Sequence, residues 1–395
     1  MRLLHTSDWH IGRTFHGHST DEHLATVLAA IADAVRTHGI DAVVVAGDVF
    51  DSSTPKADAF TMLNRALAAI REAGAQVLLT SGNHDGPARL GHMADFAAFG
   101  GVHLRTRLQD LATPVTLADA HGDVLLYGIP YIHPEFLRAA FPGFTGATHQ
   151  DALAFAMGLI RDDAAARGGA DGPARYVVAS HCFASGVSDT TEESGRAEER
   201  DISRGGLNIV GIDTFDGPDY VALGHIHSHA TLAPRVRYSG APLRFSFGEI
   251  SGSKGAWIVD LGLPGTEPEV TWLDLPAPRA AVRLTGTLED LLAPGAHPEA
   301  EDAWVDVVLT DDQLPRDAMR ALQTRYPHAV TLTHRPATRH DHGEATYAER
   351  VEGRSDLEIV DEFLGYVRNG AALSEAEKGL VADALGALEA KEATR

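Results

Sequence analysis

The stretch S-G-N-H-D-G at residues 81–86 follows an apolar run at residues 75–80. An apolar run that enters a glycine-containing turn is typical of a strand that ends at the functional edge of an α/β sheet. The turn would set an amide, an imidazole and a carboxylate side by side at that edge, those of Asn83, His84 and Asp85. The stretch therefore predicts both a sheet and the place of its chemistry.

Four other apolar runs stop in the same way. They are residues 2–6 before Asp8 and His10, residues 42–46 before Gly47 and Asp48, residues 176–180 before His181, and residues 220–223 before Gly224, His225 and His227. Packing alone does not explain five strand-like runs that each end in Asp, Asn or His. We therefore expect these side chains to form one constellation at the strand ends.

Length and composition limit what this constellation belongs to. A chain of 395 residues has room for one large domain of about 250 residues and smaller appendages. With 44% hydrophobic and 22% charged residues it has the composition of a soluble globular protein. We find no signal peptide and no apolar run of the roughly 20 residues that a membrane span needs, so we expect a cytoplasmic protein without membrane contact. The single cysteine, Cys182, excludes an internal disulfide and a cysteine-based zinc site.

The net charge is −22, from 33 basic and 55 acidic residues. This charge repels phosphate backbones at long range and argues against a stand-alone DNA-binding module. A nucleic-acid enzyme stays possible, because divalent metals, clustered arginines or a basic partner protein can supply the missing attraction.

The chain alternates strands and helices, as expected for a sheet with helices on its faces. We predict a helix at residues 21–38 that stops at Gly39, and a second from Pro55 to Gly74 with Phe60, Leu63, Leu67 and Ile70 facing inward. A third is expected at residues 150–167. The charged stretch at residues 185–206 is predicted to be a solvated loop, with a substrate-side flap as the alternative.

The proline-rich break at residues 276–278 is the first predicted domain boundary. Residues 281–336 are expected to form a small β-α-β-α-β unit, and a polar run at residues 337–347 leads to two C-terminal helices. The second of these begins with a capping box of Ser374 and Glu377. We therefore predict a catalytic domain at 1–276, a small α/β domain at 279–337, and a linker with two helices at 338–395.

The polar residues at the strand ends form a mixed set of oxygen and nitrogen donors. The seven candidate metal ligands are Asp8, His10, Asp48, Asn83, His181, His225 and His227. They are too many for one ion but suit two, and two metals about 3.5–4 Å apart can clamp a phosphoryl group, with Asp48 as the candidate bridge. In D-x-H and G-H-x-H, alternate residues of an extended segment would point the same way.

The absence of thiolate among these donors favours manganese, iron or zinc, and manganese where oxygen ligands dominate. Each donor alone has an ordinary structural explanation. Asp8 could cap a turn, and Asn83 beside a glycine is a common left-handed residue. The same explanation for all seven, each at a strand end, would require a coincidence.

Five motifs together are similar to the signature of calcineurin-like metallophosphoesterases. They are D-W-H at 8–10, G-D-V-F-D at 47–51, G-N-H-D at 82–85, a histidine after a strand at 181, and G-H-I-H at 224–227. Longer stretches, such as H-T-S-D-W-H-I-G-R-T-F-H-G near the start and R-Y-S-G-A-P-L-R-F-S-F-G-E up to Glu249, resemble the SbcD family of nuclease subunits. The resemblance is dense over residues 1–249.

This resemblance implies an α/β fold: a β-sandwich flanked by helices, with a small α/β capping domain and C-terminal helices. It assigns Asp8, His10, Asp48 and His227 to one manganese ion, and Asp48, Asn83, His181 and His225 to the other. It makes His84 the catalytic imidazole, placed to protonate the leaving 3′-oxygen or to stabilise the transition state, with Asp85 orienting it. The chain departs from the family after G-H-I-H, where Ser228, His229 and Ala230 replace a Pro-Gln pair. We expect His229 to lie at the surface or behind the ligands.

The resemblance further implies a DNA nuclease with two Mn²⁺ ions, with Mg²⁺, Fe²⁺ or Zn²⁺ as alternatives. It implies 3′-5′ exonuclease activity on double strands and endonuclease activity on single strands or hairpins, in DNA repair, recombination and replication. The implied partners are double- and single-stranded DNA and an SbcC-like ATPase, in a heterotetramer built on a homodimer. The C-terminal helices would either dock this partner or pack on the core.

Two other functions fit the sequence less well. A phosphomonoesterase or cyclic-nucleotide phosphodiesterase of the same superfamily would explain the acidic charge without a partner, but leaves the cap and the C-terminal helices without a role. A structural subunit with a vestigial site is the second alternative, and the intact ligand set argues against it.

Overall fold

The computed structural model describes residues 1–168, 174–184, 209–336, 351, 353–368 and 370–392. The predicted loop at 185–206 and the predicted linker at 337–347 lie outside these ranges. The chain divides into two units, Met1–Pro278 and Arg279–Arg395, and each is described by itself. Among the described residues, no helix has both the length and the apolar character that a membrane span requires.

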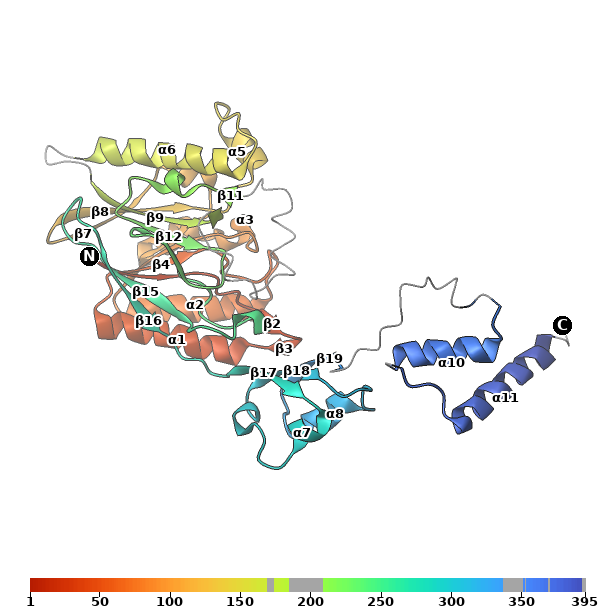
Figure 1. Ribbon diagram of the computed structural model, residues 1–395. Helices are drawn as coiled ribbons and strands as arrows, with labels where there is room; N and C mark the ends of the chain where they lie inside the picture. Colours follow the sequence, from red (N-terminus) through yellow and green to blue (C-terminus); the bar gives the residue numbers. More distant parts are fainter. Residues whose placement is uncertain (169–173, 185–208, 337–350, 352, 369, 393–395) are drawn as a thin grey trace. The chain divides into compact units, whose positions relative to one another are not determined.

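The first unit contains two six-stranded mixed sheets (Figure 1). The first sheet has the order β16 (Glu269–Asp274), β15 (Gly255–Asp260), β1 (Arg2–Thr6), β4 (Ala42–Ala46), β5 (Gln76–Thr80) and β6 (Val102–Arg105). The second has the order β13 (Ala230–Ala233), β14 (Val236–Tyr238), β12 (Tyr220–Gly224), β9 (Arg175–His181), β8 (Gly122–Ile129) and β7 (Val115–Asp119). The strands β1, β4, β5 and β6 run parallel, as do β8, β9, β12 and β14, so their carboxyl ends share an edge.

The two sheets pack face to face. Their shared core contains Leu3, Val44 and Leu78 from the first sheet and Leu126, Val177 and Ala222 from the second, each at most 1% exposed. The runs of β-branched and apolar residues in β4 and β9 are buried on both faces, as strands between a sheet and a helix layer must be. The predicted β-sandwich flanked by helices is confirmed.

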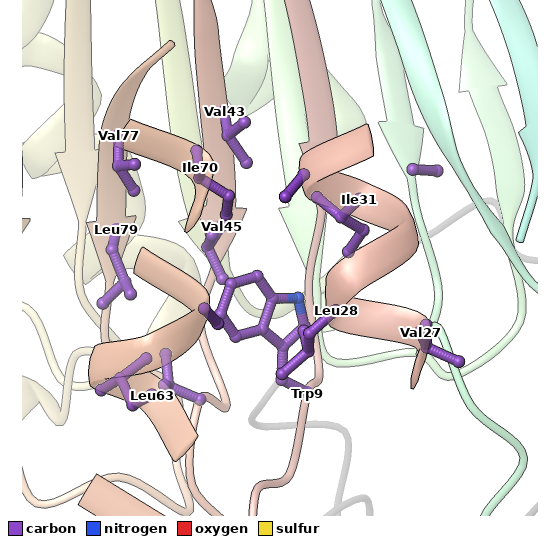
Figure 2. Close-up of a cluster of buried hydrophobic side chains, with 14 of the residues drawn as sticks. Trp9, Val27, Leu28, Ile31, Val43, Val45, Leu63, Ile70, Val77 and Leu79 are labelled. Carbon is purple, nitrogen blue, oxygen red and sulfur yellow. The ribbon is translucent and has the colours of Figure 1, made fainter. Parts of the chain in front are cut away.

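Helices cover the outer face of each sheet. The first sheet carries α1 (Asp21–His38) and α2 (Ala57–Glu72), whose side chains surround Trp9 and the valines of β4 (Figure 2). The second sheet carries α5 (Pro134–Ala140) and α6 (His149–Arg167), the latter begun by a capping box of Thr148 and Asp151.

The predicted bounds of α1 are correct, because Gly39 takes the left-handed conformation (φ 61°) that ends it. In α2 the prediction needs two corrections. The helix begins at Ala57 rather than Pro55, and Phe60 is 39% exposed. The small side chains of Ala59 and Ala66 face the core with Leu63 and Ile70, which turns Phe60 to the outer side.

Short elements complete the first unit. They are β2 (Thr14–Phe15), β3 (His18–Ser19), α3 (Pro87–Leu90), α4 (Ala94–Ala97), η1 (Ala98–Gly100), η2 (Leu108–Asp110), β10 (Phe183–Ala184), β11 (Ile209–Val210), η5 (Ile212–Phe215) and η6 (Phe247–Glu249).

The second unit begins with a three-stranded parallel sheet of β17 (Ala281–Gly286), β18 (Trp304–Leu309) and β19 (Ala329–His334). The helices α7 (Leu288–Leu292) and α8 (Ala318–Gln323) and the 3₁₀ turn η7 (Pro298–Ala300) connect these strands. A small core of its own forms around Leu291, Val305 and Val307.

Two helices, α10 (Asp356–Val367) and α11 (Glu375–Glu392), complete the described part of the second unit. Ser355 caps α10 together with Glu358. The backbone N–H of Ser374 donates to the carboxylate of Glu377 at 2.9 Å at the start of α11, and the backbone N–H of Glu377 donates to the hydroxyl oxygen of Ser374 at 3.3 Å. Reciprocal bonds of this kind satisfy backbone donors that a helix start leaves open.

Candidate metal centre

The loops that follow β1 and β4 are hydrogen-bonded to each other beyond the ends of the two strands. Asp8 donates its backbone N–H to the carbonyl of Gly47 at 3.0 Å, and His10 donates to the carbonyl of Asp48 at 3.0 Å. Between them, Trp9 is fully buried under α1 and α2 (Figure 2). The buried tryptophan thus anchors the D-W-H stretch, and the backbone of Asp8 and His10 is hydrogen-bonded to the loop after β4.

The backbone of the candidate ligands is strained. Among the described residues, seven that are not glycine have a positive φ, and four of these are candidate ligands: Asp8 (53°), His10 (44°), Asp48 (49°) and His225 (109°). Such conformations cost about 1–3 kcal/mol each and concentrate at functional sites. These φ angles also show that one expectation was wrong, namely that D-x-H and G-H-x-H are extended segments whose alternate side chains point the same way. These segments are not extended, since β1 ends at Thr6 and β12 ends at Gly224.

Two glycines of the motifs are required because neighbouring loops pass too close to them for a side chain to fit. A Cβ on Gly82 would overlap the Oδ1 atom of Asp48, and a Cβ on Gly224 would overlap the carbonyl oxygen of Ala46. Only glycine lets the three loops come this close together.

One half of the centre consists of Asp8, His10 and His227, whose potential ligand atoms lie within 4.8 Å of one another. The Nε2 atoms of His10 and His227 are 3.1 Å apart. The first two side chains are fully buried, and His227 is 11% exposed.

The other half gathers around Asn83. Its Oδ1 lies 3.0 Å from Nε2 of His181 and 3.1 Å from Nδ1 of His225. Asp48 joins the two halves, because the same oxygen, Oδ2, lies 3.3 Å from Nε2 of His181 and 3.6 Å from Nε2 of His10. The structure therefore brings all seven predicted residues together, with Asp48 between them.

Charges within this cluster depend on one another. Burial disfavours ionisation of Asp48, but the His181 and His10 imidazoles outweigh it and hold the pKa of this carboxyl well below its usual range. Burial also disfavours the charged form of His181, yet Asp48 raises the pKa of this imidazole to about 9. Burial, followed by the charge of His181, lowers the pKa of His225 to about 3. His225 is therefore in the neutral form that binds metals, whereas His181 has to lose its proton when a cation takes the place of that proton beside Asp48.

These donors fit divalent cations. The Nε2 atoms of His10 and His227 face each other at 3.1 Å and can share at most one proton, so at least one of them presents a lone pair toward the other. Carboxylate and amide oxygens lie against the same nitrogens, and buried carboxylates need compensation by a cation or by hydrogen bonds. The set contains no thiolate, since Cys182 is not among the clustered ligands. Mixed oxygen and nitrogen donors of this kind suit Mn²⁺, Fe²⁺ or Zn²⁺.

His84 lies at the rim of this cluster, with 38% of its side chain exposed. Its backbone N–H donates to Oδ1 of Asp48 at 2.9 Å, and its ring meets that of His10 at 4.8 Å between centroids. The Nδ1 atom of His84 lies 3.0 Å from the carbonyl oxygen of Asp51, and Nδ1 of His10 lies 3.4 Å from Oδ1 of the same residue. Asp51 therefore positions both imidazoles.

Asp85 occupies a different place from the one expected for it. Its carboxylate accepts the backbone N–H groups of Val49 (3.1 Å), Phe50 (2.9 Å) and Gly82 (2.9 Å). These bonds tie the loop after β5 to the loop after β4, whereas Asp51 contacts the His84 ring. Burial raises the pKa of Asp85 to about 7, even though its backbone donors oppose the shift.

Sequence reasoning also missed a buried carboxylate behind His227. Glu249 places Oε1 3.4 Å from Nδ1 of His227, accepts the Ser246 hydroxyl at 3.2 Å, and pairs with Lys254. The Nζ of Lys254 donates in addition to the carbonyl of His227 at 2.8 Å. Carboxylates in this position fix the orientation of metal-binding imidazoles. The only signal for it in the sequence is that it ends the S-F-G-E stretch of the family resemblance.

Comparisons with known proteins show the family of this chain. The family model described as calcineurin-like phosphoesterase matches residues 1–229, and the model described as type 5 capsule protein repressor C-terminal domain matches residues 278–367. The SbcD subunit of nuclease SbcCD from Escherichia coli K12 is 28% identical over 377 residues, which is 92% of each chain, and its counterpart from Escherichia coli O157:H7 gives the same values. Among solved structures, a dimetal phosphatase from Danio rerio is 12% identical, covering 70% of this chain and 98% of that chain, with a TM-score of 0.40.

These matches confirm the resemblance that the motifs predicted. They also confirm the enzyme class, a phosphodiester hydrolase.

Proposed function

This chain belongs to the calcineurin-like phosphoesterase family, and from that premise we propose that it is a manganese-dependent DNA nuclease. It would act as the nuclease subunit of an SbcCD-like complex, as a 3′-5′ exonuclease on double strands and an endonuclease on single strands and hairpins. The observation that carries the proposal is the convergence of seven oxygen and nitrogen donors around Asp48. The similarity to the SbcD subunit of nuclease SbcCD over 92% of the chain supports the choice of DNA as substrate.

Asp8, His10, Asp48 and His227 would hold one ion, and Asp48, Asn83, His181 and His225 the other. Divalent cations, when bound, supply Lewis acidity to a phosphoryl group and make water a stronger nucleophile at neutral pH. The protein contributes a rigid placement of these donors, because each lies at the end of a strand of the sandwich or in the loop that follows it. The backbone strain at four of them is maintained by the loop-to-loop hydrogen bonds.

The imidazole of His84 would give a proton to the leaving 3′-oxygen. Its Nδ1 faces the carbonyl of Asp51 at 3.0 Å, so this nitrogen carries the proton of that hydrogen bond. Nε2 is then the ring atom left for the reaction, and it carries a proton to give when the ring is an imidazolium. After this proton has passed to the leaving oxygen, the neutral ring regains one from solvent, because the side chain is 38% exposed. Asp85 would act indirectly, by holding the loop that carries Asn83 and His84 against the loop that carries Asp48.

The net charge of the chain indicates that a partner protein helps it to bind DNA. At −22 the chain repels DNA at long range, so we expect an SbcC-like ATPase to supply much of the affinity, in a heterotetramer built on a homodimer in the cytoplasm. Residues 279–337 would form a cap that orients DNA, and residues 338–395 would dock the ATPase. The match of residues 278–367 to a family model of its own supports a distinct role for this region.

One experiment separates this function from its alternative, a phosphatase or cyclic-nucleotide phosphodiesterase for small molecules. The purified chain, loaded with Mn²⁺, is assayed on duplex DNA, a DNA hairpin, p-nitrophenyl phosphate and a cyclic nucleotide, with Asp48→Ala as the background control. We expect cleavage of both DNA substrates at rates well above the control. Hydrolysis of the small esters without cleavage of either DNA would replace the proposal by the alternative.

A further inference from the structure

Aromatic and imidazole rings form a row that begins at the metal centre and leads outward. The ring of Tyr131 lies 6.4 Å from that of His181, His133 lies 5.1 Å from Tyr131, and Phe136 lies 5.5 Å from His133, all measured between centroids. We call Tyr131, His133 and Phe136 the ring row. Exposure rises along it, from the buried His181 through the half-buried Tyr131 to the exposed His133 and Phe136.

The ring row is fixed to the centre by the backbone. Tyr131 comes just after β8, and its N–H donates to the carbonyl of Ser81 at 2.8 Å, at the start of the S-G-N-H-D-G turn. His133 is the N-cap of α5, and Pro134 at the first helical position sets the direction of the helix. Leu137 of α5 is fully buried and belongs to the hydrophobic cluster that includes Leu153 and Ala156 of α6.

Core packing accounts for only part of this row. The buried His149 lies 5.2 Å from Tyr131 and 6.2 Å from His133 between ring centroids, but no such neighbour covers Phe136 in the described residues. Phe136 is 61% exposed, although Leu137 beside it is buried. Neighbouring rings of the row meet at 80–81°, edge to face, so no pair of them is stacked in parallel. At least one face of each ring is therefore not covered by its neighbour in the row.

We propose that the ring row is a binding site for an unpaired nucleobase, next to the phosphodiester that the enzyme hydrolyses. This inference rests on the proposed nuclease function and adds to it a preference for a strand whose terminal base is unstacked. A base is joined to its phosphate through one sugar, so the base beside a phosphate held at Asp48 and His181 lies within reach of Tyr131. Successive bases can stack on aromatic side chains without sequence preference, because every base has a π-face.

The chemistry of the row favours this occupant. Its three rings, a phenol, an imidazole and a phenyl group, are of the kind that stack on bases in single-stranded nucleic-acid sites. They adjoin a centre built for phosphate esters, which gives the backbone of the same strand its own binding place. The row would thus compensate in part for the repulsion between DNA and a chain of charge −22.

The test uses the full-length chain with Mn²⁺ and pairs of single-stranded oligonucleotides. Within each pair, one member carries an abasic tetrahydrofuran residue at a single position flanking the cleaved bond. The variants are Phe136→Ala, Phe136→Trp, His133→Ala and Tyr131→Phe. Phe99→Ala is the matched control, because Phe99 is 90% exposed and lies in η1, at the amino-terminal end of β6 and so at the opposite edge of the sheet.

For the intact oligonucleotide we expect Phe136→Ala to lower kcat/KM by about tenfold, in line with the loss of one stacked base, and Phe136→Trp to restore it. On the abasic oligonucleotide, kcat/KM of the two Phe136 variants should differ from that of the wild type by less than about twofold. A second readout is the fluorescence of 2-aminopurine at the flanking position, bound to the slow His84→Ala variant. Stacking quenches this fluorescence, and adding Phe136→Ala should relieve the quenching, whereas adding Phe99→Ala should not.

Equal losses on the intact and abasic substrates, or unchanged quenching without Phe136, would overturn the base site while leaving the nuclease in place. An effect of Phe136→Ala on partner association alone would assign the row to a protein contact instead. A wild type that cleaves none of the oligonucleotides would remove the nuclease function, and the base site with it.

Discussion

The metal centre and the C-terminal helices hold their important side chains in opposite ways. Asp8 and His10 are fully buried and Asp48 is 2% exposed, on backbone that is strained and hydrogen-bonded from loop to loop. Among the described residues of α10 none is buried, and Tyr366 and Val367 are more than half exposed. In α11, Leu380 is 70% exposed.

This difference reflects two kinds of function. Metal ligands must be placed to within a fraction of an ångström, which a strand end in a packed sandwich can do and an isolated helix cannot. The helices α10 and α11 are stabilised locally, by capping residues and by ion pairs such as Arg368 with Glu377, and they leave apolar side chains in water. Exposed apolar helix faces are typical of surfaces that bind a partner. We therefore expect changes in the centre to affect chemistry and changes in the helices to affect assembly.

The largest effect is expected for Asp48→Ala, which should abolish hydrolysis and lower the content of bound metal. Without this carboxylate, the two cations would face each other with less charge compensation. Metal analysis and turnover of the purified variant test this, with Asp58→Ala on the surface of α2 as the control. Full metal content with normal turnover in Asp48→Ala would show that the centre is built around another residue.

His84→Ala should retain most of its metal and lose about 10²–10⁴ in rate, the usual contribution of a general acid. The ring lies at the rim and is held by Asp51, so its removal leaves the other donors in place. The measurement is the rate at saturating Mn²⁺ together with metal content, and the exposed His92→Ala serves as the control. If metal is lost along with activity, His84 is a ligand.

A smaller loss should follow from Glu249→Gln, about 10–100-fold in metal affinity. The substitution keeps the size of the side chain but removes the charge that orients His227 and pairs with Lys254. Manganese titration of the apo-protein measures this, with Glu269→Gln in the exposed β16 strand as the control. Thermal unfolding of the apo-proteins separates the effect from a loss of stability. If Glu249→Gln binds manganese as tightly as the Glu269→Gln control, the contact of Glu249 with His227 and Lys254 has a purely structural role.

The smallest effect on hydrolysis is expected for deletion of residues from 341 onward. The shortened chain should remain a manganese-dependent nuclease, since every candidate ligand lies before residue 228, but should no longer associate with an SbcC-type ATPase. A full-length Leu380→Ser, Leu388→Ser double variant should show the same separation without truncation, because both side chains are more than half exposed. Co-purification with the ATPase is the measurement. Undiminished association of both proteins would make the helices part of the fold rather than a docking site.

The sequence by itself determined where the chemistry lies along the chain. The strand runs, the Gly39 stop of α1 and the polar residues after each strand are local patterns, and the structure reproduces them. Motif spacing also indicated that the donors belong together, because parallel strands present their carboxyl ends at one edge.

Tertiary structure alone decided which residues support those donors. Asp85 binds three backbone N–H groups because two loops meet at its carboxylate. Glu249 contacts His227 although two strands, β13 and β14, separate them in the sequence. Phe60 faces outward because Ala59 and Ala66 allow α2 to pack closely against the sheet. Local sequence sets the backbone preference of a residue, but the partner of its side chain depends on which segments packing brings together. His10 and His227 are 217 positions apart in the sequence, yet their Nε2 atoms lie 3.1 Å from each other.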